Sequence, residues 1–123
     1  MKKFTGLFLL FALVLLALVP VSAQDDDTIR IGALVKNLDN TYFLTMQEGY
    51  EFAAERYGVE IVVGSTPTED AAEEQLNILE TWLNEGGFDA FIVTPFRATS
   101  LNAGLVEATN QGIPIINIDE LIP

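Results

Sequence analysis

The 123-residue chain contains neither cysteine nor histidine. Without cysteine it forms no disulfide and no thiolate nucleophile, and without histidine it lacks Ser-His catalysis and the usual zinc ligands. Basic residues are also scarce, because six Lys+Arg stand against eighteen Asp+Glu, for a net charge of −12. A chain this acidic repels phosphate backbones and anionic lipids, which argues against nucleic-acid binding. Half of the residues are apolar and one fifth are charged, a composition typical of one globular domain or part of one.

The first 23 residues have the pattern of a secretory signal. Two lysines near the start are followed by an unbroken apolar run from Leu7 to Val19, and the small residues Val21 and Ala23 fit a cleavage site. We therefore expect cleavage after Ala23. The alternative is an uncleaved N-terminal anchor, because residues 4–21 are just long enough to span a bilayer.

The mature chain is expected to begin with an acidic leader over residues 24–27 and to fold over residues 28–123. In either case the signal predicts a periplasmic or extracellular protein. The last predicted strand is apolar and no helix follows it, so we expect a further neighbour for that strand beyond Pro123.

Residues 28–123 alternate apolar, β-branched runs with helical spacings of apolar residues. The order predicts a three-layer α/β/α, doubly wound parallel sheet, because right-handed crossovers place helices on both faces. We expect strand order 2-1-3-4, with ligands binding at the carboxyl ends of the strands near the switch point between strands one and three. The predicted strands are residues 28–35, 59–63, 90–93 and 113–118, and the predicted helices are residues 42–57, 66–84 and 100–110.

The clearest local signal is Thr66-Pro67-Thr68-Glu69, which predicts the start of the second helix. Thr66 can cap the helix, Pro67 suits the first helical position and Glu69 completes a capping box. Helical spacing also predicts one buried face on each helix. The residues expected there are Phe43, Met46, Tyr50, Ala53 and Tyr57, then Ala72, Leu76, Leu79 and Leu83, then Leu101, Leu105 and Ala108.

Polar side chains follow all four predicted strands. Carboxylates and amides beside flat aromatic rings suit a polyhydroxylated ligand, because they accept and donate hydrogen bonds while the rings pack on apolar C–H faces. Several have a purely structural alternative: Asn40 as a helix cap, Phe43 as a core residue, Asp119 as a turn residue, and Arg97 with Glu120 as a surface ion pair. The candidates are Lys36, Asn37, Asp39, Asn40, Tyr42 and Phe43, then Ser65 and Thr66, then Thr94 and Arg97, then Asp119 and Glu120.

Three segments resemble type I periplasmic binding proteins of the ribose-binding-protein-like family. Residues 31–43 (IGALVKNLDNTYF) resemble its opening strand and a loop ending Asn-x-aromatic-Phe. Val93-Thr94-Pro95 resembles the family's Asn-Pro or Thr-Pro after strand three, and residues 112–119 (GIPIINID) resemble its fourth strand, which ends in aspartate. The resemblance covers residues 28–119.

The resemblance implies two α/β lobes that close on a small ligand and deliver it to an ABC importer, with no enzymatic step and no cofactor. The implied partners are a monosaccharide or similar small polar ligand and the transporter permease, with no nucleic acid and no membrane contact except through the permease or an uncleaved anchor. Glu120 stands where the ribose binder has arginine and Thr94 where it has asparagine, which counts against ribose itself. The implied ligand contacts are Asn40, Tyr42, Phe43, Thr94 and Asp119.

Other functions fit the sequence less well. The sensor domain of a repressor would need a basic helix-turn-helix where the signal lies. A receiver domain would need an aspartate at Thr94, and a flavodoxin would need a glycine in the phosphate loop after strand one, where residues 36–41 have none. A two-lobed sensor that serves a chemotaxis or kinase receptor remains the alternative to uptake.

Overall fold

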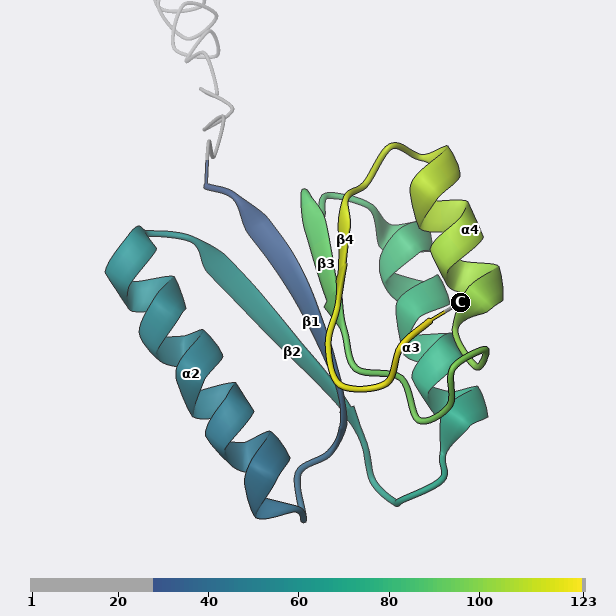
Figure 1. Ribbon diagram of the computed structural model, residues 1–123. Helices are drawn as coiled ribbons and strands as arrows, with labels where there is room; N and C mark the ends of the chain where they lie inside the picture. The colour runs from purple at the N-terminus through teal and green to yellow at the C-terminus, as the bar shows by residue number, and fades with distance from the viewer. Residues whose placement is uncertain (1–27, 123) are drawn as a thin grey trace, which may run out of the picture.

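The computed structural model describes residues 28–122 (Figure 1). The predicted signal and acidic leader, residues 1–27, lie outside the described residues. None of the helices among residues 28–122 is long and apolar enough to cross a membrane. In chain order the elements are β1 (Arg30–Asn37), α2 (Thr41–Tyr57), β2 (Glu60–Thr66), α3 (Ala72–Glu85), β3 (Ala90–Val93), α4 (Asn102–Asn110) and β4 (Ile115–Asn117).

The four strands form one parallel sheet in the order β2-β1-β3-β4, which confirms the predicted topology. Helix α2 covers one face of the sheet, and α3 and α4 cover the other (Figure 1). Strand β1 is buried on both faces over residues 32–35. Strand β3 is buried only on the face of Phe91 and Val93, whereas Ala90 and Ile92 are partly buried because α2 packs on β1 and β2, so the predicted cover on both faces of this strand is incomplete. The sequence order of strands and helices was sufficient to predict these three layers.

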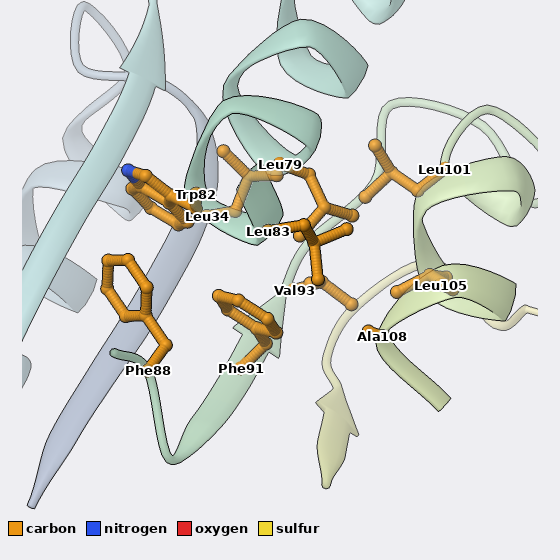
Figure 2. Close-up of a cluster of buried hydrophobic side chains, with 10 residues drawn as sticks. All are labelled: Leu34, Leu79, Trp82, Leu83, Phe88, Phe91, Val93, Leu101, Leu105 and Ala108. Atoms are coloured by element: carbon orange, nitrogen blue, oxygen red, sulfur yellow. The ribbon is translucent and has the colours of Figure 1, made fainter. Parts of the chain in front are cut away.

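The main apolar core lies between the sheet and the pair α3 and α4 (Figure 2). The indole of Trp82 stacks on the ring of Phe91, with centroids 6.1 Å apart and planes 4° from parallel. Glycines in the adjoining strands make room for these rings, because a Cβ at Gly32 would lie 2.7 Å from the Phe91 ring and one at Gly64 would lie 2.7 Å from Trp82. Sequence spacing predicted Leu79 and Leu83 in this core but missed Trp82.

Helix α2 is buried less deeply than α3. Phe43 is buried and Met46, Tyr50 and Ala53 are partly buried, but Tyr57 is 70% exposed, so its predicted place on the buried face is wrong. Tyr57 is the last helical residue before the chain turns at Gly58, and its ring lies at the surface with the Arg56 guanidinium 5.7 Å away.

The predicted capping box at the second helix is also wrong. Thr66 ends β2 and is buried, and its hydroxyl lies within hydrogen-bond distance of two carbonyls, those of Lys36 at 2.9 Å and Thr68 at 3.0 Å, which share its single proton. Thr66 belongs to β2, beside a register shift between β1 and β2, and residues 67–71 separate it from the start of α3, so it is too far away to cap that helix. Helix α3 starts only at Ala72, and its N-cap residue Ala71 has no side-chain hydrogen bond.

Two helical glycines provide a matched test of packing. A Cβ on Gly104 of α4 would lie 2.7 Å from Cδ2 of the fully buried Leu79, whereas one on Gly49 of α2 would meet no atom within 4 Å. We expect Gly104→Ala to lower the free energy of unfolding by about 1–3 kcal/mol through overpacking. Gly49→Ala should raise it by about 0.5–1 kcal/mol through helix propensity. Urea denaturation of the two variants measures the difference, and equal effects would contradict the packing between α3 and α4.

Tyr50 provides a test of burial on the α2 side. Its hydroxyl is buried and makes no hydrogen bond to residues 28–122, and burial, followed by the nearby Tyr42, raises the pKa of the Tyr50 phenol above its ordinary 10.0. Because the pKa is higher in the folded state than in the unfolded state, the folded state holds the phenol proton more tightly. This contribution to the free energy of unfolding is fully present below pH 10 and is lost as pH rises through the folded-state pKa. We expect Tyr50→Phe to remove that alkaline loss and to raise the free energy of unfolding by roughly 1 kcal/mol at neutral pH.

The matched control for Tyr50 is Tyr57→Phe, because Tyr57 is exposed. Denaturation curves between pH 8 and pH 11 compare the variants. An alkaline loss that persists in Tyr50→Phe would show that another group causes it.

Candidate functional site

The carboxyl ends of the four strands lie at one edge of the sheet, at the bottom of Figure 1. The loops that follow the strands meet at this edge, as the parallel topology requires. The predicted site residues belong to three of these loops and to the first turn of α2. The sheet therefore collects polar groups from distant parts of the sequence in one region.

An ion pair connects the carboxyl end of β1 to the loop after β4. The ammonium of Lys36 lies 2.9 Å from Oδ2 of Asp119, and these two side chains are 18% and 40% exposed. The same ammonium lies 5.8 Å from the centre of the Phe43 ring. The pair thus places a donor, an acceptor and an aromatic ring close together while part of each polar group still faces solvent.

Asp119 is held by the conformation of its loop. Its backbone φ is 71°, in the left-handed region that aspartate and asparagine tolerate better than most residues. The side-chain amide of Asn117 donates to the carbonyl of Glu120 at 2.9 Å, and its oxygen accepts from the amide of Ile122 at 3.1 Å. Asp119 is therefore a turn residue, as one alternative predicted, and it also holds its carboxylate beside Lys36.

The aromatic pair at the start of α2 is divided between surface and core. Tyr42 is 53% exposed, whereas Phe43 is 7% exposed, and their rings meet edge to face with centroids 5.1 Å apart. Asn40 is the N-cap of α2 and accepts from the Tyr42 amide at 2.9 Å, which confirms the capping alternative. Tyr42 borders a shallow hollow of about 380 Å³ together with Met46.

Thr94, also among the predicted contacts, lies beneath the site. It is fully buried, and its hydroxyl donates to the sulfur of Met46 at 3.8 Å. Its backbone amide donates to the Leu34 carbonyl, which continues the β1–β3 ladder past the end of β3. The structure brings Asp119 to Lys36, which also lies near the Phe43 ring, whereas Thr94 is fully buried.

A concavity of about 320 Å³ opens beside these groups, toward the loop that follows β2. Lys36, Asn37 and Asn40 are among the predicted strand-end candidates, whereas Glu69 and Asp70 are not. The Arg97 guanidinium lies 3.8 Å from the Asp70 carboxylate, so the predicted pairing of Arg97 with Glu120 is wrong. The residues that line the concavity are Lys36, Asn37, Asn40, Phe43, Glu69, Asp70 and Phe96.

Gln75 is not among the predicted site residues. It lies on α3 and binds the backbone at the carboxyl ends of β1 and β3. It is fully buried, and its amide nitrogen donates to the carbonyls of Val35 at 3.1 Å and Thr94 at 2.9 Å. Its oxygen accepts from the Phe96 amide at 3.2 Å. Gln75 therefore fixes the ends of β1 and β3, from which two of the site loops start. The signal was its position four residues before Leu79, on the buried face of α3.

The polar groups at this edge suit recognition of a polar ligand. Among residues 28–122 there is no group of three carboxylate, histidine or cysteine side chains placed to hold a metal ion. Carboxylate, ammonium and carboxamide groups at a sheet edge can exchange hydrogen bonds with hydroxyls, and exposed ring surface can pack against C–H groups.

Residues 31–123 match the family model of the periplasmic binding protein domain. This chain belongs to that family. The predicted fold class is confirmed by solved structures of periplasmic binding proteins, which share the arrangement of strands and helices. The resemblance inferred from the strand and loop sequences is thus also confirmed.

Curated relatives among the periplasmic binding proteins bind sugars. The D-ribose/D-allose-binding protein of Pseudomonas aeruginosa is 30% identical over 97% of this chain, and the ribose import binding protein of Haemophilus influenzae is 32% identical over 97% of it. The chain spans 40% and 38% of the lengths of these two relatives.

Solved structures of the same family carry bound sugars. An ABC transporter periplasmic solute-binding protein from Actinobacillus succinogenes, with bound D-allose, aligns with a TM-score of 0.73 and 30% identity, over 78% of this chain and 33% of that one. A solute-binding protein from Agrobacterium vitis, bound with α-D-tagatopyranose, aligns with a TM-score of 0.69 and 27% identity, over 77% of this chain and 31% of that one.

Proposed function

We propose that this chain forms the first lobe of an exported binding protein that captures a monosaccharide or a similar small polar ligand for an ABC importer. The observation that carries the proposal is the Lys36–Asp119 pair beside Phe43, at the carboxyl edge of the sheet. Sugar-binding relatives with the same fold support the ligand class and the transporter partner. The proposed role is binding and delivery, without an enzymatic step.

The chemistry of the pair explains why it suits a sugar. A carboxylate only accepts hydrogen bonds and an ammonium only donates them, so Asp119 and Lys36 together satisfy neighbouring hydroxyls, each of which both donates and accepts. Hydrogen bonds to charged groups are about twice as strong as neutral ones, which compensates for the water that a sugar loses on binding. In the proposed site Tyr42 and Phe43 pack on the ring, Asn40 and Asp119 contact its hydroxyls, and Thr94 supports them from below.

A thermal-shift screen of the natural full-length protein tests the proposal. D-ribose, D-allose and xylitol are the first probes, because relatives bind these compounds. A ligand that binds only the native state at 100 times its Kd stabilises it by about 2.7 kcal/mol, so a correct sugar should raise the Tm by several degrees. Unchanged melting with every neutral monosaccharide and polyol would overturn the proposed function.

Export is part of the same proposal. Residues 1–23 are proposed to be a signal that is removed after Ala23, so the mature protein should begin at Gln24. N-terminal sequencing of material from outside the cytoplasmic membrane measures this directly. Met1 retained in the membrane fraction would instead support the uncleaved anchor.

A further inference from the structure

The concavity beside Asn37 reaches beyond the proposed sugar contacts. Its far wall comes from Glu69 and Asp70, in the loop between β2 and α3, and neither residue is among the contacts that the family resemblance implies. The rings of Phe43 and Phe96 also border it. Its volume of about 320 Å³ is at the lower end of the range for small-molecule sites, roughly 300–1,000 Å³.

Asn37 supplies the observation that points to a ligand. The residue is only 3% exposed and lines the concavity, yet its side-chain amide makes no hydrogen bond to any other residue in the range 28–122. A carboxamide can accept and donate several hydrogen bonds. The polar atoms of Asn37 are not sealed from solvent, because the buried and unpaired side-chain atoms among residues 28–122 are Oε1 of Gln47 and the hydroxyl of Tyr50, so the amide is open to the concavity. A group that enters the concavity would satisfy it.

The charges around the concavity decide which kind of group enters. The Lys36 ammonium is compensated by Asp119 at 2.9 Å, and the Asp70 carboxylate has the Arg97 guanidinium at 3.8 Å. Glu69 forms no ion pair with any residue among 28–122. The uncompensated group is therefore a carboxylate, which accepts hydrogen bonds and repels anions.

We propose that this concavity is a subsite for a hydrogen-bond-donating substituent of the ligand, a hydroxyl or an ammonium group, held by Glu69 and Asn37 beside the ring that Asp119 contacts. The inference rests on the proposed function and adds to it. It makes the loop after β2 a determinant of which sugar is bound, and it excludes ligands with a carboxylate or phosphate at that position, because Glu69 would repel them.

Calorimetric titration of the natural full-length protein tests the subsite, with D-allose and D-ribose as neutral probes and D-glucosamine as the ammonium probe. The variants are Glu69→Gln, which removes the charge of an exposed residue, and Asn37→Ser, which removes the carboxamide. Glu73→Gln is the matched control, because Glu73 is an exposed glutamate on α3 that does not line the concavity. We expect Glu69→Gln to weaken an ammonium probe about tenfold and a neutral probe about threefold.

Each outcome decides between the alternatives. A loss confined to D-glucosamine identifies an ammonium group in the subsite, and a loss shared by the neutral probes identifies a hydroxyl. If a substitution at Asp119 weakens binding while Glu69→Gln behaves like Glu73→Gln, the subsite is wrong and the proposed function stands. If no probe binds the unmodified protein, the proposed function fails and the subsite fails with it.

Discussion

Asp119→Asn is expected to weaken sugar binding by about tenfold to a hundredfold, because it removes a charged acceptor whose hydrogen bonds contribute about 1.5–3 kcal/mol each. Asparagine is the appropriate substitute, since the backbone φ of 71° at this position would strain alanine by roughly 1–2 kcal/mol. The side chain keeps its size and the loop keeps its shape. Isothermal titration with the sugar found in the thermal-shift screen measures the loss.

The adjacent carboxylate provides the control for Asp119. The Glu120 side chain makes no hydrogen bond or ion pair with residues 28–122, and only its backbone carbonyl takes part in the loop. Glu120→Gln changes the net charge by the same amount and should leave the affinity unchanged. Equal losses in both variants would mean that long-range charge, rather than a contact by Asp119, affects binding.

Gln75→Leu should lower the free energy of unfolding by about 3–5 kcal/mol. The substitution fills much of the same volume, but it removes three hydrogen bonds and leaves the carbonyls of Val35 and Thr94 and the Phe96 amide without that partner. Each buried polar group left unpaired costs about 1–3 kcal/mol. Urea denaturation measures the change, and Gln111→Leu is the control, because Gln111 is exposed and its side chain bonds only the Glu107 carboxylate.

Gln75 should also influence binding through the strand ends that it holds together. We expect Gln75→Leu to lower the sugar affinity under conditions where the protein is still folded, since the loops after β1 and β3 lose their common anchor. Gln75→Glu retains the acceptor for the Phe96 amide, but its second oxygen faces the carbonyls of Val35 and Thr94, so it should recover part of the stability only at acidic pH, where the carboxyl is protonated and can donate. If Gln75→Leu unfolds no more easily than Gln111→Leu, the buried network does not contribute as described.

The architecture was largely predictable because the parallel α/β arrangement follows from the order of elements. Apolar runs such as residues 90–93 alternate with amphipathic segments, and the rule of right-handed crossovers leaves few ways to connect them. The boundaries were less predictable. Thr66, Pro67 and Glu69 form a standard capping pattern, but pairing with β1 keeps Thr66 in β2, and the helix starts only at Ala72. Long-range strand pairing thus overrides a local signal.

The site was predictable in its location and less so in its contacts. Parallel topology placed the strand-end loops at one edge, so Asp119 and Lys36 were both expected there. Lys36 and Asp119 are 83 residues apart in sequence, and their pairing depends on the left-handed backbone conformation of Asp119. No local sequence pattern predicts that conformation. Gln75 escaped selection because a polar residue on a helix is usually exposed. Its spacing from Leu79 places it on the buried face, but the carbonyls of Val35 and Thr94 that it binds are brought there only by the tertiary fold.

A crystal structure of the natural full-length protein with the sugar from the thermal-shift screen tests the central claim most directly. We predict a ligand hydroxyl within about 2.6–3.2 Å of the Asp119 carboxylate, a second one near the Lys36 ammonium, and the ring against the aromatic pair at the start of α2. The claim would be contradicted by a sugar bound elsewhere, for example in the groove between α4 and Ile122, with Lys36 and Asp119 still paired only to each other.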